Sequence, residues 1–316
     1  MRIQPVLICV ICAPQRTGGE KMKLLTFRKD GAESIGALSE NGKYVYPLTA
    51  FGITDQSMNE LIDNWTLEKK ERIENRMSDG GVRPEYRVTE LEILAPIPVP
   101  KQDMICLGIN YMEHAAESAR YKKEAFGGER PYAVYFSKRI NEAVPDKGVI
   151  ESHSDLTDSL DYEAELAFIV GKDAKDVAEE DVEEYIFGYT IINDVSAREV
   201  QTRHKQWYFG KSLDRFTPMG PWIVTADEIS FPPRLAVRSR VNGELRQDGN
   251  TKQLIFGIPH IMQELTRGMT LKAGTIVATG TPAGAGMGFD PPKFLKPGDV
   301  VECEIESIGR LTNTVG

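Results

Sequence analysis

The stretch DSLDYEAELAFIVG, residues 158–171, joins three acids at alternate positions to a strongly apolar run. Asp161, Glu163 and Glu165 alternate with apolar residues, and side chains two residues apart on a β-strand point to the same face. From Ala164 to Val170 both faces of this strand carry mainly apolar residues, which is typical of a buried strand. The sequence therefore predicts three carboxylates on one face of a largely buried strand.

Carboxylates that lie close together in a partly buried site must either take up protons or bind a cation. Hard oxygen ligands favour Mg²⁺, Mn²⁺ or Ca²⁺ over zinc. The alternative is a strand at the margin of a sheet whose acids are solvated, although the apolar residues on both faces speak against it. At the level of the residues, both interpretations stay open.

A further acid, Asp194, ends a second predicted strand in YTIINDVSARE, residues 189–199. Ser196 is predicted to N-cap the following helix, with Glu199 closing a capping box. Asp194 would then lie at a strand-to-helix corner, where site residues are common; the alternative is a turn acid without function. Two glutamates and this aspartate would leave coordination positions for substrate and water, as magnesium prefers.

The segment CLGINYMEHAAESARY, residues 106–121, predicts a helix that Asn110 caps, with Glu113 at its third position. His114 and Glu117 are three residues apart and so share one helical face. A carboxylate beside an imidazole is the arrangement needed for a general base that acts on water. His-x-x-Glu pairs also occur on ordinary surface helices, so the pair alone does not define a site.

The 316 residues are enough for one large domain or two modest ones. Residues 22–95 combine short strand patterns with a helical pattern at 58–77, which predicts a small N-terminal α+β domain. The proline-rich LAPIPVPKQD, residues 94–103, predicts a linker. Residues 96–316 are rich in strand patterns and form the expected catalytic domain, with helices near 110–124, 196–206 and 255–267. Residues 1–21 are expected to be a leader or a loose arm.

The net charge of −9 argues against a nucleic-acid partner, because such affinity depends on Lys and Arg neutralising phosphates. The apolar VLICVICA, residues 6–13, is shorter than the ~20 residues of a membrane helix, so no membrane association is expected. Four scattered cysteines favour a reducing cytoplasm over a disulfide framework. Cys9 and Cys12 form a CxxC, but no second pair or nearby histidine completes a zinc site.

Six segments of the chain closely resemble the fumarylacetoacetate hydrolase family. They are GINYMEHAAE (108–117), LDYEAELAFIVGK (160–172), IINDVSAREVQ (191–201), FGKSLDRFTPMGPWIV (209–224), VNGELRQDG (241–249) and ATGTPAGAG (278–286). The resemblance implies an α+β, β-rich fold with a mixed β-roll or barrel-like catalytic domain, and a homodimer. Residues 22–95 are similar to the small N-terminal domain that many members carry.

The same resemblance assigns roles to individual residues. It implies a divalent cation, Mg²⁺ or Mn²⁺ with Ca²⁺ as a further option, held by Glu163, Glu165 and Asp194. Asp161 falls outside this ligand set and is expected to be structural. The resemblance also implies that His114 and Glu117 form a water-activating pair. Lys211 would lie near the substrate carboxylate or enolate, and a loop with Gly280 and Thr281 would contact the substrate carboxylate.

The implied reaction is hydrolysis of a carbon–carbon bond in a 4-acyl-2-oxo acid of the acylpyruvate type, through a metal-bound enolate. The same site suits isomerisation, tautomerisation or decarboxylation of 2-oxo acids, and a non-catalytic metal-stabilised β-protein is a more remote alternative. Leu107 stands where longer members carry a fourth acidic ligand, so the chain resembles the acylpyruvase or 2-hydroxyhepta-2,4-diene-1,7-dioate isomerase-like branch. The residues that contact the acyl group stay open; candidates are Tyr121, Arg139, Arg203 and Arg246.

Overall fold

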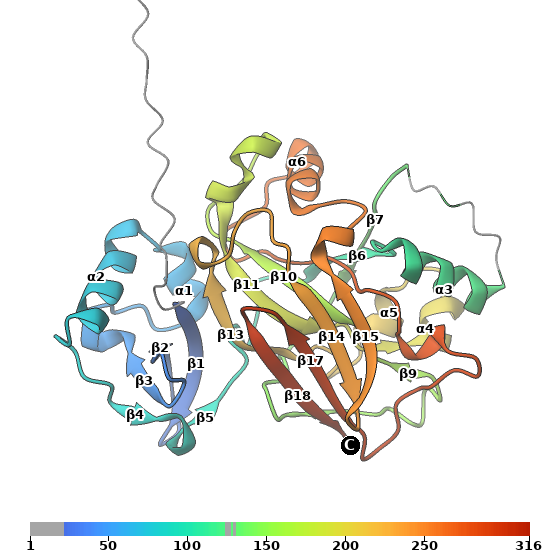
Figure 1. Cartoon of the computed structure of the whole chain (residues 1–316), viewed down its shortest axis with the longest axis horizontal. Coiled ribbons are helices and arrows are strands. Elements are labelled where there is room, and N and C mark those ends of the chain that lie inside the picture. Colours follow the sequence, from blue (N-terminus) through green and yellow to red (C-terminus); the bar gives the residue numbers. More distant parts are fainter. Residues whose placement is uncertain (1–21, 124–127, 129–130) are drawn as a thin grey trace, which may run out of the picture.

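The computed structural model describes residues 22–123, 128 and 131–316. The predicted leader and the Cys9–Cys12 pair lie outside these residues. Two large sheets dominate the described chain, and six α-helices flank them (Figure 1). The helices are α1 (Met58–Asp63), α2 (Leu67–Ser78), α3 (Met112–Lys122), α4 (Arg198–Arg203), α5 (Tyr208–Lys211) and α6 (Ile258–Gly268).

The larger sheet has eleven strands and is mostly antiparallel. In spatial order its strands are β4 (Tyr86–Arg87), β3 (Tyr44–Pro47), β2 (Ala32–Leu38), β1 (Lys23–Lys29), β13 (Met219–Thr225), β11 (Ile186–Asn193), β10 (Ala164–Val170), β16 (Ile276–Ala278), β6 (Met104–Gly108) and β7 (Val134–Lys138), with β5 (Glu92–Ile93) beside β1. The β-rich α+β class is confirmed. The described strands form open sheets and no closed barrel, since this order ends at β4 and β7.

A five-stranded sheet packs against the larger one. Its order is β15 (Glu244–Asn250), β14 (Ala236–Val241), β17 (Val300–Ile305), β18 (Gly309–Val315) and β8 (Val149–Ile150). A small ladder joins β9 (Leu160–Asp161) to β12 (Ser196–Ala197). Leu166 and Phe168 of β10 lie in the hydrophobic cluster shared with β14 and β17, whereas Ala167 and Ile169 lie in a second cluster. The central strand is therefore buried on both faces, as the sequence predicts.

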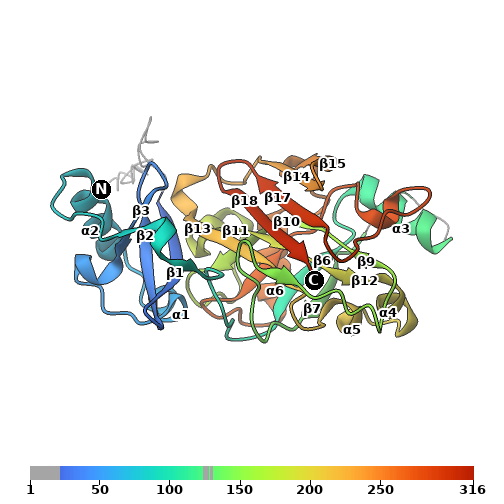
Figure 2. The same ribbon diagram turned by 90° about the horizontal axis from the view of Figure 1, so that it is seen from below.

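The N-terminal strands continue the same sheet. Lys23 and Leu24 of β1 pair with Val224 and Ile223 of β13, and one hydrophobic cluster includes residues from both parts of the chain. Figures 1 and 2 show this N-terminal part, with α1 and α2, at the end of the molecule opposite α3, α4 and α5. The division into domains at residue 95 stays a prediction, because the sheet runs through both parts.

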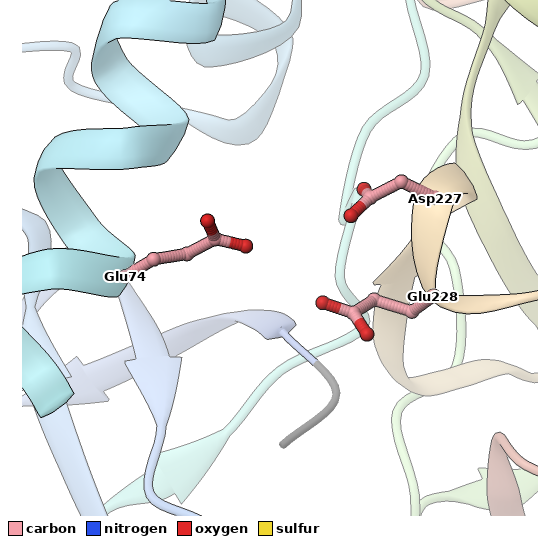
Figure 3. A group of neighbouring side chains, drawn as sticks. All are labelled: Glu74, Asp227 and Glu228. Atoms are coloured by element: carbon pink, nitrogen blue, oxygen red, sulfur yellow. The ribbon is translucent and has the colours of Figure 1, made fainter. Parts of the chain in front are cut away.

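Charged side chains also join the two parts. Figure 3 shows Glu74 of α2 facing Asp227 and Glu228, which belong to the short 3₁₀ helix Ala226–Glu228. The ammonium of Lys70 lies 2.5 Å from Asp227 Oδ2 and 3.5 Å from Glu74 Oε1. This lysine therefore bridges acids from α2 and from the segment that follows β13.

The predicted helix caps are wrong in two places. Tyr111 precedes α3 and Ala197 precedes α4, and neither side chain caps its helix. The Asn110 amide instead donates to the carbonyls of Phe256 and Thr279, and the Ser196 hydroxyl donates to the carbonyl of Asp194. The polar side chains that the local pattern predicts as helix caps instead form hydrogen bonds with other parts of the fold. No described helix is both long and apolar enough to span a bilayer.

Candidate active site

Antiparallel pairing of β10 and β11 creates the carboxylate cluster. Ala164 pairs with Asn193, so that Glu163 lies beside Asp194, and the Asp194 N–H donates to the Glu163 carbonyl at 2.9 Å. Glu163, Glu165 and Asp194 are at most 4% exposed, and each offers one oxygen within 4.8 Å of the others. The structure therefore brings together the three residues predicted to bind a metal.

Three buried cations balance these acids. Lys211 donates to Glu163 Oε2 and to Asp194 Oδ2, both at 2.6 Å. Lys138 donates to Asp194 Oδ1 at 2.6 Å, and the Arg198 Nη2 group donates to Glu163 Oε1 at 2.6 Å. Like-charge repulsion among the acids is therefore offset by side chains from β7, α4 and α5.

The neighbouring glutamates differ in their electrostatics. Burial alone would raise the pKa of Glu163, but Arg198 and Lys211 together hold that pKa well below its usual range. Burial, reinforced by the charges of Asp194 and Glu163, raises the pKa of Glu165 well above its usual range. Glu165 Oε2 accepts one backbone hydrogen bond, from the Gly280 N–H at 2.8 Å. A cation at this cluster would favour the ionised form of Glu165.

The predicted dyad lies at the same site. His114 Nδ1 is 3.5 Å from Glu117 Oε2, and His114 Nε2 is 3.8 Å from Glu163 Oε1. Both oxygens of Glu117 accept the Gly284 N–H at 3.1 Å, so the loop after β16 holds this carboxylate next to the imidazole. The helix α3 thus places the His114 imidazole between Glu117 and the carboxylate cluster.

Asp161 is placed as a structural residue. Its carboxylate accepts from Arg198 Nε at 2.8 Å and from the N–H groups of Gly286 and Met287 at 2.6 and 3.1 Å. Arg198 therefore links Asp161 to Glu163, and Asp161 ties both to the loop after β16. The prediction that one strand carries all three acids is wrong, because Asp161 belongs to β9, Glu165 to β10, and Glu163 lies between the two strands. Asp161 pairs with β12 and does not join the cluster of three.

The Gly280–Thr281 segment lines the cluster in a different way from the expected one. The Gly280 N–H donates to Glu165, and the Thr281 hydroxyl donates to the Ala164 carbonyl at 2.9 Å while accepting from Gln247 at 2.7 Å. Thr281 still lines the pocket above the cluster. Contact of these two residues with a substrate carboxylate stays a prediction.

Lys138 and Arg198 were not recognised in the sequence as site residues, although both are fully buried here. A signal was present for each. Lys138 closes the apolar strand pattern YAVYFSK, where a charge needs a partner. Arg198 follows Asp194 by four residues, just after the strand-to-helix corner.

The cluster fits a hard divalent cation. Three carboxylates with converging oxygens match the preference of Mg²⁺ and Mn²⁺ for oxygen ligands. Lys211 donates to one oxygen each of Glu163 and Asp194, which shows that these oxygens converge on a position suited to a positive charge. Glu163, Glu165 and Asp194 are thus the residues that would hold the ion.

A pocket opens over the cluster. Its most deeply buried lining includes Glu165 and Lys211, whereas Tyr121, Lys122 and Trp207 line its more exposed part. Leu107, at the position where longer family members carry an acid, also lines it. Of the four candidates for contact with the acyl group, Tyr121 is the one that lines this pocket.

Comparison with known proteins identifies the group to which this site belongs. The family model described as the C-terminal part of fumarylacetoacetate hydrolase matches residues 103–316. The chain belongs to the fumarylacetoacetate hydrolase family. The family resemblance seen in the sequence is therefore confirmed over the segment that carries all of the predicted site residues.

Individual family members are similar over most of the chain. An oxaloacetate tautomerase, YisK of Bacillus subtilis (strain 168), is 46% identical over 231 residues, covering 73% of this chain and 75% of its own. The fumarylacetoacetate hydrolase structure from psychrophilic Exiguobacterium antarcticum is 40% identical, with a TM-score of 0.76 and coverage of 93% and 99%.

A third family member was solved with ligands. The maleylpyruvate hydrolase from Sphingobium sp. SYK-6, in complex with manganese (II) ion and pyruvate, is 27% identical, with a TM-score of 0.72 and coverage of 93% and 98%. The family therefore includes tautomerases and hydrolases, and at least one member whose structure holds a divalent metal.

Proposed function

We propose that the protein is a divalent-metal-dependent enzyme that interconverts the keto and enol forms of an oxaloacetate-type 2-oxo acid. The observation that carries the proposal is that His114 and Lys211 flank one carboxylate cluster within a single pocket. The 46% identity to an oxaloacetate tautomerase supports the choice of reaction.

Tautomerisation needs one group that moves a proton at carbon and another that stabilises negative charge on oxygen. His114 Nε2 would accept the proton from C3 of the oxo acid, and the Glu117 carboxylate, 3.5 Å from Nδ1, would stabilise the imidazolium that forms. The Lys211 ammonium would stabilise the enolate oxygen, which then receives a proton from water to give the enol, while the His114 imidazolium returns its proton to solvent. A bound divalent cation would supply Lewis-acid polarisation of the carbonyl.

A second candidate is hydrolysis of an acylpyruvate, and the His114–Glu117 pair favours it. A histidine oriented by a carboxylate can remove a proton from water, which would attack the distal carbonyl of a 4-acyl-2-oxo acid. The carbon–carbon bond would break to give a carboxylic acid and the enolate of pyruvate, which is protonated at carbon. Lys211 would serve the same enolate in both reactions. The homodimer implied by the family resemblance also stays a proposal.

The reactions are distinguished by their products. Purified protein with Mg²⁺ or Mn²⁺ should accelerate the loss of ultraviolet absorbance when enol-oxaloacetate ketonises, without release of pyruvate. Pyruvate from acetylpyruvate would show hydrolysis, and pyruvate from oxaloacetate would show decarboxylation. Removal of the metal with EDTA should abolish turnover. Unchanged ketonisation in EDTA, or none above the buffer rate with metal, would contradict the proposal.

Replacement of His114 tests the proton-transfer role. His114→Ala should lower ketonisation and hydrolysis by about 10²–10⁴-fold, the usual contribution of a general acid or base. Oxaloacetate decarboxylation should persist, because it needs no activated water. The control is His260→Ala, on α6 and away from the pocket lining. Ketonisation at the wild-type rate in His114→Ala would show that the imidazole is not the proton carrier.

A metal-stabilised protein without catalysis is separated by a melting experiment. A ligand that binds only the folded state stabilises it by about 2.7 kcal/mol at a concentration of 100 times Kd. Mg²⁺ should therefore raise the melting temperature of the EDTA-treated protein. Stabilisation without turnover of any 2-oxo acid would favour the structural alternative.

A further inference from the structure

One wall of the pocket is aromatic and joins its buried and exposed parts. Phe136 and Trp207 pack edge to face, with ring centroids 5.3 Å apart, and both line the pocket. Gly108 allows this packing, because a Cβ at that position would lie 2.1 Å from Cζ3 of the Trp207 ring. The indole therefore has a defined place over the β6 backbone.

An ammonium group lies against each end of this wall. Lys211 Nζ is 5.3 Å from the centroid of the Phe136 ring, at the carboxylate cluster. Lys122 Nζ is 5.1 Å from the centroid of the Trp207 ring, and it comes from the last turn of α3. Aromatic faces attract cations, so the indole positions the Lys122 ammonium at this end of the wall.

The two ends differ in burial. At the buried end, Lys211 and Arg198 donate to Glu163. Lys122 is partly exposed and lines the same pocket. A bound 2-oxo acid with its oxo end at the cluster would extend along the aromatic wall toward Lys122.

We infer that Lys122, seated on Trp207, recognises the distal carboxylate of a 2-oxo dicarboxylic acid and so selects diacids over monoacids. The inference rests on the proposed function, because it takes the oxo end of the substrate to lie at the cluster. Charge pairing at the rim of a site contributes mainly to selectivity and encounter rate, and less to turnover once the substrate is bound.

Binding of a matched pair of acids tests the inference without turnover. The probes are 2-oxoglutarate and 2-oxopentanoate, which have the same chain length and differ in the terminal carboxylate. Calorimetry with Mg²⁺ should show tighter binding of the diacid by the wild type. Lys122→Met, which keeps most of the apolar stem, should weaken diacid binding by about tenfold and leave monoacid binding unchanged. Lys122→Glu should weaken diacid binding further.

The neighbouring Lys123 provides the control. It is exposed and is not among the pocket's lining residues, so Lys123→Met removes the same charge from the same helix end without altering the pocket. Equal weakening by the two methionine variants, or equal weakening of both probes in Lys122→Met, would overturn the inference. Melting temperatures of the two variants check that both are folded.

Turnover distinguishes the inference from the proposed function. Selectivity for 2-oxoglutarate that depends on Lys122, in a protein that does not ketonise oxaloacetate, would contradict only the proposed function. Ketonisation of oxaloacetate and of its 4-methyl ester with equal kcat/KM by the wild type would contradict only the role of Lys122. With both correct, Lys122→Met should raise KM for oxaloacetate about tenfold and change kcat little.

Discussion

The guanidinium of Arg198 contacts three side chains beside the carboxylate cluster. It donates to Asp161, Glu163 and Gln201 at 2.8, 2.6 and 3.2 Å, and it is 2% exposed. A buried ion pair is a weak source of net stability, but removal of one partner leaves the other charge uncompensated. The contribution of Arg198 to stability is therefore best measured by replacing it with an uncharged residue.

Arg198→Met should lower the free energy of unfolding by about 3–5 kcal/mol, because Asp161 and Glu163 would lose the cation that joins them. Chemical denaturation followed by fluorescence measures the change. The control is Arg203→Met on the same helix, where the side chain is exposed and a change within about 0.5 kcal/mol is expected. Equal stability of the two variants would show that the buried arginine is dispensable.

The acids of the site could be predicted from the sequence, and their cations could be predicted only in part. Strand alternation pointed to Asp161, Glu163 and Glu165 alike, and Asp194 stood out by its place at a strand end, but only the family resemblance separated Asp161 from the other three. Lys138 and Arg198 reach their partners across elements that are 56 and 35 residues away in the chain. Sequence spacing within one element carries no information on such long-range contacts.

At the scale of elements, the loop after β16 decides the position of Glu117. Gly284 has φ +102°, and a Cβ there would lie 1.9 Å from the Arg246 carbonyl oxygen. The Gly284 N–H is also the donor to both Glu117 oxygens. This one position therefore combines a left-handed backbone, a close approach to β15 and support for the dyad.

Gly284→Ala should displace the loop and lower turnover more than tenfold, because a shift of the Glu117 carboxylate removes the orientation of His114. The matched control is Gly243→Ala, with φ +80° and no atom within 4 Å of the added Cβ. Both variants carry backbone strain of about 1–3 kcal/mol. Turnover and melting temperature measured together separate the effects, and equal turnover in the two variants would contradict the role of the loop.

Element boundaries could be predicted less well than the elements themselves. The helical pattern at 58–77 is two helices, α1 and α2, separated at Asn64–Thr66, where the Thr66 hydroxyl accepts from the Lys69 N–H. The local pattern predicts Asn110 as a helix cap, but its side-chain amide instead makes two hydrogen bonds with the backbone of Phe256, 146 residues away. Capping patterns describe hydrogen bonds between a side chain and its own helix end, and partners from other parts of the fold can replace these bonds.

At the scale of the whole molecule, Lys70 joins the N-terminal part to the larger one. Burial lowers the pKa of Lys70, but the hydrogen bond to Asp227 and the charges of Asp227, Glu74 and Glu228 outweigh it and raise the pKa above 10.5. A group whose pKa is raised by folding stabilises the fold fully below its unfolded pKa. This contribution is lost as the pH rises through the folded value.

Lys70→Met should therefore lower the free energy of unfolding by about 0.5–1 kcal/mol at neutral pH, since Asp227 is 45% exposed and solvent screens the pair. The difference from the wild type should persist up to pH 10.5 and shrink above it. Denaturation across this range measures it, with Arg72→Met on α2 as the control for an exposed ion pair. A difference that grows above pH 10.5 would contradict the assignment.

The pairing of β1 with β13 bears on how the protein can be cut. A fragment that begins after the proline-rich segment 94–103 would lack β1. The backbone groups of Val224 and Ile223 in β13 would then lose their pairing with Lys23 and Leu24. A bare strand margin of this kind is a template for self-association and aggregation. A fragment without the N-terminal strands would thus be prone to aggregation, although it keeps every residue of the pocket.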